Sequence, residues 1–265
     1  MNQVRAKKHL GQHFLTDPNI ARKIAATLSD QVQVIEVGPG TGMLTKFLLE
    51  RNFNRLIAIE VDKESIDFLK QTYPQLENNL LEGDFLRLDL SALFEGDFAV
   101  TGNFPYNISS QILFKVLDYV HQVTELTGMF QKEVAERVAA THGNKTYGIL
   151  SVLIQIFYDT EYLFTVHEHV FSPPPKVKSA VIRLTRKAIL PAIADKALLF
   201  QVVKTGFNQR RKTLRNALSG MCDMHAPNLE KWAGKRAEQL SPAEFIQLTT
   251  EILHSRQLPQ LPQHE

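Results

Sequence analysis

A glycine-rich loop stands between a short apolar run and a helical pattern near the start of the chain. The run VQVIEVG ends at Gly38, and the loop E-V-G-P-G-T-G spans Glu36 to Gly42. The following stretch, TGMLTKFLLERN, places Leu44 and Phe47 on one face of a helix. Glycine lets the backbone turn sharply and approach a ligand, and a helix N-terminus offers unpaired N–H groups. The sequence therefore predicts a strand, a loop suited to a ligand, and a helix, in that order.

Apolar runs and helical patterns continue to alternate to about residue 140. The runs RLIAIEVD, NLLEGD, DFAVTGN and LTGMFQ are predicted as strands or strand ends, and KESIDFLKQTY, SSQILFKVLDYV and KEVAERVAA as helices. The stretch DPNIARKIAATLS, before the glycine loop, is also predicted as a helix, with Asp17 as N-cap and Pro18 at the first helical position. This alternation predicts an α/β fold, with a doubly wound parallel sheet and helices on both faces. We expect EYLFTV and SAVIRLTRK to complete the sheet as antiparallel strands, with FSPPPKVK as the loop between them.

The pattern changes near Lys187, after which every segment is helix-like. One of these helices carries the pattern of a capping box, with Ser241 as N-cap, Pro242 at the first helical position and Glu244 three residues after the cap. We therefore predict two domains, a sheet-containing domain over residues 1–186 and a small all-helical domain over residues 187–265.

Composition limits the compartment and the cofactors. The single cysteine, Cys222, cannot form an internal disulfide, and no stretch has the roughly 20 apolar residues that a membrane helix needs. These features predict a cytoplasmic protein that does not enter a membrane. His167 and His169 have no third ligand nearby, so no metal site is predicted.

Basic residues are concentrated although the net charge is only +2. Such clusters are usually solvated surface, but they can also contact nucleic acid phosphates. The cluster that we consider as a candidate for RNA binding consists of Arg210, Arg211, Lys212 and Arg215, which we expect on different faces of one helix.

Carboxylates at strand ends suggest which ligand the glycine loop binds. A dinucleotide loop of the G-x-G-x-x-G type would need a third glycine where the chain has Met43, which argues against a nicotinamide oxidoreductase. Glu60 ends the second strand, where a carboxylate can accept both ribose hydroxyls of an adenosine. Asp84, after the third strand, could contact the N6 amine of the cofactor adenine through its carboxylate or its neighbouring backbone. The loop, with Gly38 and Gly40, resembles that of class I S-adenosylmethionine-dependent methyltransferases, although a plain structural turn remains an alternative.

The segment T-G-N-F-P-Y-N follows another strand and has the groups needed to hold an exocyclic amine. The lone pair of an adenine N6 is delocalised into the ring, so an enzyme must orient the nitrogen toward the methyl donor. The Asn103 side-chain oxygen and the Phe104 carbonyl could accept the two N6 hydrogens. Pro105 fixes the turn so that this carbonyl points outward, and it has no backbone N–H that would compete for the acceptor. Tyr106 could stack on the extruded base. A strand-end turn with a half-buried tyrosine is the simpler alternative.

Together these motifs closely resemble the bacterial small-subunit (16S) rRNA adenine dimethyltransferases. The stretches that carry the resemblance are GQHFL, VIEVGPGTGMLT, IAIEVD, EGDFL, GNFPYNIS, FSPPPKVKSAVIRL and FNQRRKTLRNAL. The resemblance implies a Rossmann-like methyltransferase sheet and an rRNA-contacting helical domain. It also implies dimethylation of N6 of two adjacent adenines in a hairpin loop near the 3′ end of 16S rRNA in the small subunit (30S), with S-adenosylmethionine, during ribosome biogenesis. We expect a monomer.

The resemblance also assigns residues. It places cofactor contacts at His13, Leu15, Gly38, Glu60, Asp84 and Asn103, the target adenine at Asn103, Phe104 and Tyr106, and a second stacking face at Phe171. Three positions depart from the family. His13 replaces a usual Asn, Phe104 replaces a usual Leu, and Lys178 stands where Asp is frequent. We expect the change at Phe104 to be harmless if only its carbonyl acts, which would leave its side chain free to vary.

For the chemistry we expect direct transfer from the sulfonium to N6, driven mainly by positioning. The alternatives are an adenine-N6 methyltransferase that acts on large-subunit rRNA or on DNA, and a non-catalytic ribosome-assembly factor that leaves the cofactor site unused.

Overall fold

The computed structural model describes residues 4–30 and 32–257. Its main sheet has the strand order β4-β3-β2-β5-β6-β9-β7. Strands β4, β3, β2, β5 and β6 are parallel, and β9 runs antiparallel to both β6 and β7. In sheet order the strands span Leu80–Glu82, Arg55–Glu60, Gln33–Val37, Phe98–Asn103, Val123–Gln131, Ser179–Arg186 and Tyr158–Val166. The predicted doubly wound sheet is confirmed. Its predicted antiparallel completion is confirmed for β9 but wrong for β7, which is antiparallel to β9 and so runs in the same direction as the five parallel strands.

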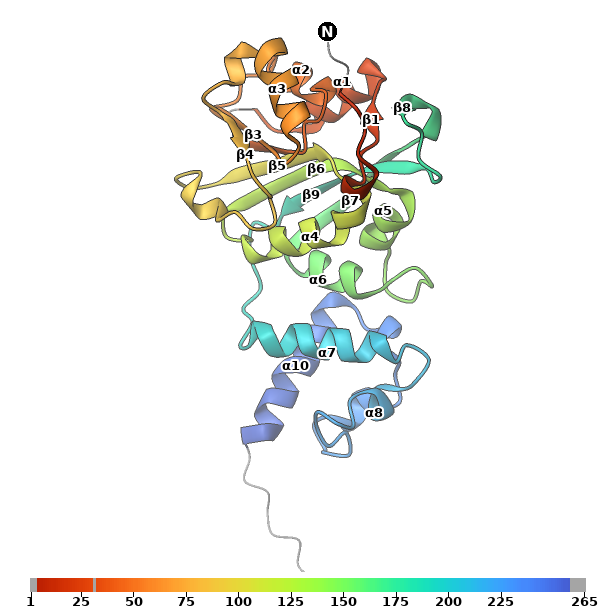
Figure 1. The fold of residues 1–265 in the computed structure, drawn as a ribbon. Helices are drawn as coiled ribbons and strands as arrows, with labels where there is room; N and C mark the ends of the chain where they lie inside the picture. The colour runs from red at the N-terminus through yellow and green to blue at the C-terminus, as the bar shows by residue number, and fades with distance from the viewer. Residues whose placement is uncertain (1–3, 31, 258–265) are drawn as a thin grey trace, which may run out of the picture. The chain divides into compact units, whose positions relative to one another are not determined.

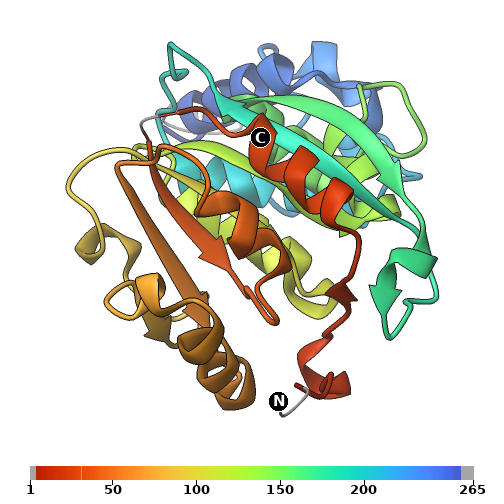
Figure 2. The same ribbon diagram turned by 90° about the horizontal axis from the view of Figure 1, so that it is seen from above.

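Helices cover both faces of this sheet (Figures 1 and 2). Helices α1 (Pro18–Thr27), α2 (Met43–Leu48) and α3 (Lys63–Thr72) lie on one face, and α4 (Ser109–Asp118) lies on the other. Helix α5 (Lys132–Ala139) directly follows β6. Because the central strands are covered on both sides, almost every side chain of β2 and β5 is buried.

Two helix starts follow from capping residues that the sequence predicts. The Asp17 side chain accepts hydrogen bonds from the backbone N–H groups of Asn19 (2.8 Å) and Ile20 (3.4 Å) at the start of α1. At the start of α10 the Ser241 hydroxyl accepts from the Glu244 N–H (3.3 Å), and the Glu244 carboxylate accepts from the Ser241 N–H (2.8 Å). Both pairs satisfy donors that a helix leaves unpaired in its first turn.

A second, two-stranded sheet was not predicted. Strand β1 (Phe14–Leu15) pairs antiparallel with β8 (Phe171–Ser172), so Leu15 lies opposite Phe171. The segment FSPPPKVK was expected to be a loop throughout. Two-residue strands carry no periodic pattern, and this pairing joins residues far apart in the chain, so it follows only from the tertiary structure.

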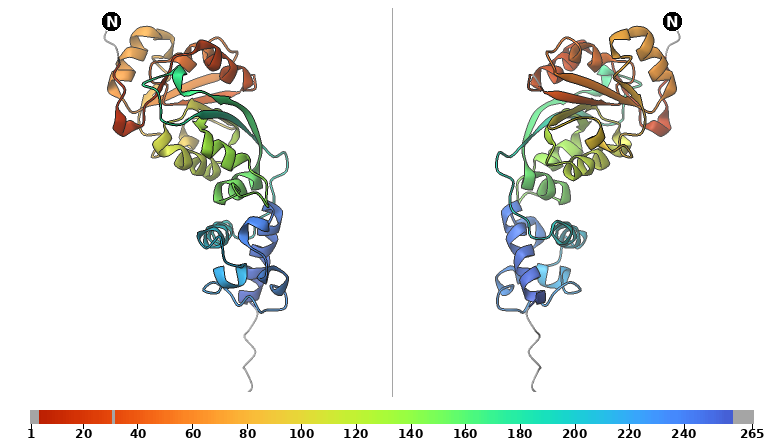
Figure 3. Two further views of the ribbon diagram at one scale, coloured as in Figure 1. Left: turned by 90° about the vertical axis from the view of Figure 1, so that its right-hand side faces the viewer. Right: turned by 90° about the vertical axis from the view of Figure 1, so that its left-hand side faces the viewer.

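Helix α6, earlier in the chain, packs with helices near the C-terminus, which are drawn in cyan to blue in Figure 3. Helix α10 packs against α6 and α7. The helices of this group span Ile149–Phe157 (α6), Lys196–Asn208 (α7), Leu214–Ala217 (α8), Glu230–Ala233 (α9) and Pro242–Gln257 (α10).

Across residues 4–30 and 32–257, no helix has both the length and the apolar character that crossing a membrane requires.

The chain divides into two compact units. The first contains residues 1–136 and 158–187, and the second contains residues 137–157 and 188–265. The first unit ends one residue beyond the domain boundary predicted after residue 186. Residues 137–157, which the sequence placed in the first domain, instead group with the C-terminal helices, because α6 packs against α7 and α10. Residues 258–265 of the predicted second domain lie outside the described part.

The side chain of Phe104 belongs to the core of the first unit. Its ring is 1% exposed, and its centroid lies 4.6 Å from that of Phe130. Gly102 on β5 and Gly128 on β6 lie opposite each other in the sheet, and a Cβ on either would press on this ring. The expectation that the Phe104 side chain can vary freely is therefore wrong, because the ring occupies space that two glycines leave open.

This packing predicts that Gly128→Ala destabilises the first unit. The added methyl would overlap the Phe104 ring, and overpacking of this kind costs about 1–3 kcal/mol. Gly234→Ala is the matched control, because a Cβ there meets nothing within 4 Å. Chemical denaturation should show a clear loss for the first variant and little change for the second. Equal stability of the two variants would contradict this packing. Adding Phe104→Leu to Gly128→Ala should recover part of the lost stability.

Candidate active site

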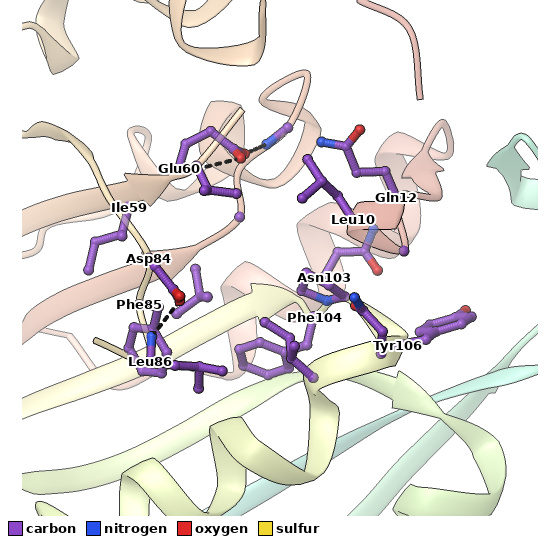
Figure 4. Close-up of a pocket in the computed structure, with 18 of the residues that line it drawn as sticks. Leu10, Gln12, Ile59, Glu60, Asp84, Phe85, Leu86, Asn103, Phe104 and Tyr106 are labelled. Carbon is purple, nitrogen blue, oxygen red and sulfur yellow. Dashed lines mark hydrogen bonds between the residues drawn. The ribbon is translucent and has the colours of Figure 1, made fainter. Parts of the chain in front are cut away.

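The carboxyl ends of β4, β3, β2 and β5 meet at one pocket in the first unit (Figure 4). Glu60 and Asp84 lie at one end, and Asn103 and Tyr106 lie at the other. Residues 10–14 of the N-terminal segment also line the pocket. Parallel strands in open α/β folds place their ligands at this edge.

A buried carboxylate holds the glycine loop at the first end of the pocket. One oxygen of Glu60 accepts from the Gly40 N–H (3.0 Å), and the other accepts from the N–H groups of Val61 (2.8 Å) and Asp62 (2.9 Å). Burial raises the pKa of Glu60, and these three N–H donors oppose the rise. The bond to Gly40 ties the loop after β2 to the end of β3.

Gly40 has no room for a side chain. Its φ is 56°, and a Cβ would lie 2.9 Å from the ring of Phe14. The loop backbone is thus left open to the pocket while Phe14 packs on it from the N-terminal segment. A backbone cradle that only glycine permits is the arrangement that a bound cofactor requires.

Asp84 is placed at the same end of the pocket. One of its oxygens accepts from the Leu86 N–H (2.9 Å), and the other lies 3.4 Å from Arg87 Nε. The side chain is 40% exposed. The turn after β4 is therefore held by its own carboxylate, which keeps the backbone of residues 83–86 along the pocket wall.

At the opposite end the Asn103 amide has a defined orientation. Its Nδ2 donates to the backbone carbonyl of His13 (2.8 Å). Because the two amide atoms point in different directions, this bond turns Oδ1 away from His13 and leaves it as an acceptor. The Phe104 N–H donates to the Met129 carbonyl (3.1 Å), which fixes the backbone where β5 ends.

Tyr106 is held by its hydroxyl and by its ring. The hydroxyl is hydrogen-bonded to Oγ of Ser179, at the start of β9. The ring centroid lies 5.3 Å from that of His13. The ring therefore has a fixed position beside Asn103.

Two residues that the resemblance assigned to the site are buried in the core. Phe171 is 4% exposed and pairs with Leu15 in the β1–β8 sheet. It does not line the pocket, so the structure does not support its assignment as a second stacking face. Leu15, also 4% exposed, lines a small neighbouring cavity with Gly38, Gly40 and Asn103.

Glu36 lines the same small cavity and was not singled out from the sequence. It is fully buried, and the Thr45 hydroxyl donates to its Oε2 (2.7 Å). Burial raises the pKa of Glu36 to about 8, and the charge of Glu60 contributes in the same direction. A carboxylate two residues before the first glycine of the loop is the signal that could have identified it.

The sequence predicted the basic cluster on one helix, and this prediction is wrong. Helix α7 ends at Asn208 and α8 starts at Leu214, so residues 209–213 form the connection. Arg210 pairs with Glu238 (2.6 Å) and Arg215 with Glu230 (2.8 Å). Arg211 and Lys212 are exposed. These two present their charge to solvent, whereas Arg210 and Arg215 share theirs with a glutamate.

His167 and His169 do not lie on a strand. They follow β7, and their rings stack with centroids 5.9 Å apart. Within residues 4–30 and 32–257, no group of three or more His, Cys, Asp or Glu side chains could hold a metal ion.

Comparison with known proteins agrees with this geometry. Residues 3–253 match the family described as ribosomal RNA adenine dimethylase. The chain belongs to this family. It is 55% identical over 256 residues to the ribosomal RNA small subunit methyltransferase A of Cytophaga hutchinsonii, with 94% of this chain and 98% of that protein covered.

Solved structures agree as well. A dimethyladenosine transferase from Plasmodium falciparum matches with a TM-score of 0.77 and 27% identity, covering 92% of this chain and 98% of that one. The 23S rRNA methyltransferase ErmE, at 24% identity and TM-score 0.68, covers 90% of this chain and 99% of that one and shows the fold alone. As a dimethylase of this family, the chain is an S-adenosylmethionine-dependent enzyme with the class I methyltransferase fold. The oxidoreductase alternative is thereby excluded.

Glu36 gives the dimethylase a testable pH dependence. Its folded pKa of about 8 lies above the ordinary value of 4.5, so the folded state retains a proton that the unfolded state releases. The stability that this proton contributes is complete below about pH 4.5 and is lost as the pH rises toward 8, by at most about 1.4 kcal/mol per pH unit.

Glu36→Gln should remove this loss, because an amide stays neutral. Chemical denaturation at pH 6 and pH 8 should show that the variant loses less stability than the parent over this interval. Thr45→Val keeps the carboxyl and is the control that should retain the pH dependence. Identical pH profiles for Glu36→Gln and the parent would contradict the assignment.

Proposed function

We propose that this enzyme dimethylates N6 of two adjacent adenines in a hairpin loop near the 3′ end of 16S rRNA, within the small ribosomal subunit, as a step of subunit biogenesis. Family membership and the small-subunit relative support the substrate. The observation that carries the proposal is the Asn103 amide, which the His13 carbonyl orients with its oxygen available as an acceptor. We further propose that the enzyme is a cytoplasmic monomer.

The cofactor end of the pocket suits S-adenosylmethionine, which supplies a methyl group on a sulfonium. The backbone of Gly38 and Gly40, which lines the pocket, would approach the amino-acid part. Glu60, at the end of β3, would accept the ribose hydroxyls, and Asp84 with its neighbouring backbone would contact the cofactor adenine. Leu15 would reach the cofactor only through the small cavity.

The base end provides the groups that orient the target amine. Asn103 Oδ1 and the Phe104 carbonyl would accept the two N6 hydrogens, and Pro105 sets the turn that presents this carbonyl. Tyr106 would stack on the extruded adenine. No side chain need act as a strong base, because N6 becomes acidic only as its bond to the methyl carbon forms and the sulfonium C–S bond breaks, and its proton can then leave to solvent. Catalysis then rests mainly on positioning.

The basic connection between α7 and α8 is proposed to contact rRNA phosphates. Arg211 and Lys212 are exposed and would make these contacts. Arg210 is instead proposed to hold this connection in place and Arg215 to join α8 to α9, because each already pairs with a glutamate. This divides the basic cluster into two RNA-contacting and two structural residues.

Asn103→Ala should abolish methyl transfer while cofactor binding falls only partly. Loss of an oriented acceptor at the reacting nitrogen is expected to lower the rate by about 10²–10³-fold. Incorporation of labelled methyl groups into unmodified small subunits measures transfer, and calorimetry measures cofactor binding. Full methyl incorporation by the variant would refute the role of Asn103. Primer extension on 16S rRNA would locate the modified adenines in the parent.

Charge reversal at Arg211 should weaken binding to small subunits and reduce its dependence on salt. Loss of a phosphate contact lowers the slope of log K against log salt concentration by about 1. Lys70→Glu is the control, because Lys70 is an exposed cation on α3, outside the basic cluster. An unchanged salt series for Arg211→Glu would remove this residue from the RNA interface.

A further inference from the structure

We propose that the side chain of His13 is a positioning residue for the target base, which acts by bracing Tyr106, and that it is not a cofactor ligand. The inference rests on the proposed function, since it concerns the end of the pocket where Tyr106 would stack on adenine. It differs from the role that the resemblance assigns to this position, where the family usually has Asn and where a cofactor contact is expected.

The His13 side chain is fixed by groups on the side of the base end. Its Nδ1 donates to the backbone carbonyl of Pro173 (2.8 Å), in the segment after β8. Its ring centroid lies 5.3 Å from that of Tyr106, and the two planes are inclined by 32°. The imidazole is thus held between Pro173 and Tyr106.

The backbone of His13 contacts Asn103, the other residue proposed to hold the base. The His13 carbonyl accepts from Asn103 Nδ2 (2.8 Å). One residue therefore positions both proposed base contacts, Asn103 through its carbonyl and Tyr106 through its ring. A substitution at position 13 keeps the carbonyl, so it tests the ring separately.

The spacing of the two rings decides which face of Tyr106 is available. A base in van der Waals contact with both rings would need their planes about 7 Å apart. Their centroids are only 5.3 Å apart, so no base fits between them. His13 covers one face of Tyr106, and an adenine must stack on the other.

The hydroxyl of Tyr106 supplies a second fixed point. It is hydrogen-bonded to Oγ of Ser179, which is fully buried at the start of β9. With its hydroxyl held by Ser179 and one face backed by His13, the ring cannot retreat when a base presses on the free face. This is how a residue that does not itself touch the base can set the position of N6.

Three substitutions separate the parts of this role. His13→Ala removes the ring and the bond to Pro173, His13→Phe restores a ring against Tyr106 without the bond, and His13→Asn offers a donor but a smaller face. Each full-length variant is assayed with unmodified small subunits for kcat and KM, and by calorimetry for the Kd of S-adenosylmethionine. Thermal unfolding verifies that each variant is folded.

We expect His13→Ala to lower kcat by at least about 10-fold, because a displaced Tyr106 ring would misplace N6 of the stacked adenine. The Kd of S-adenosylmethionine should stay within about twofold of the parent value, since no cofactor contact is lost. His13→Phe should recover more of kcat than His13→Asn. In a Tyr106→Leu background His13→Ala should have little further effect, because coupled residues are not additive.

Two results would overturn the inference. One is a Kd for the cofactor that weakens in step with kcat/KM in His13→Ala, which would make His13 a cofactor ligand. The other is a kcat in His13→Ala equal to that of the parent. Both are distinct from failure of the proposed function, in which the parent itself would leave 16S rRNA unmodified.

Discussion

The hydrogen bond from Asn103 to the carbonyl of His13 determines what the pocket can do. It joins the end of β5 to a segment 90 residues earlier in the chain and selects the oxygen of the amide as the atom left to accept. That segment is itself anchored, since Gln12 Nε2 donates to Asp62 (3.3 Å), Lys7 pairs with Asp62, and β1 pairs with β8. The orientation of a single amide therefore depends on contacts spread over most of the first unit.

Two buried carboxylates lie beneath the glycine loop. Burial raises the pKa of both Glu36 and Glu60, and each is held by hydrogen-bond donors of the surrounding structure. A carboxylate buried at such a cost is a group that a bound positive charge stabilises.

Local features of the sequence predicted much of this molecule. The caps at Asp17 and Ser241 and the alternation of strands and helices all depend on neighbours within a few residues, and the structure has them. Several expectations failed because long-range contacts decide them. Residues 137–157 group with the C-terminal helices, Phe171 is buried against β1, and the Phe104 ring fills space beside Gly128 on the next strand.

The sequence by itself determined the kinds of residues at each strand end, because the motifs that bear them are contiguous. It placed a glycine loop, Glu60, Asp84 and Asn103 in the order that a class I methyltransferase requires. Only the tertiary structure decided which atom of Asn103 is left to accept, which ring packs against Tyr106 and which cations form ion pairs. Those properties depend on the N-terminal segment and on ion pairs between helices, and no local pattern encodes such long-range contacts.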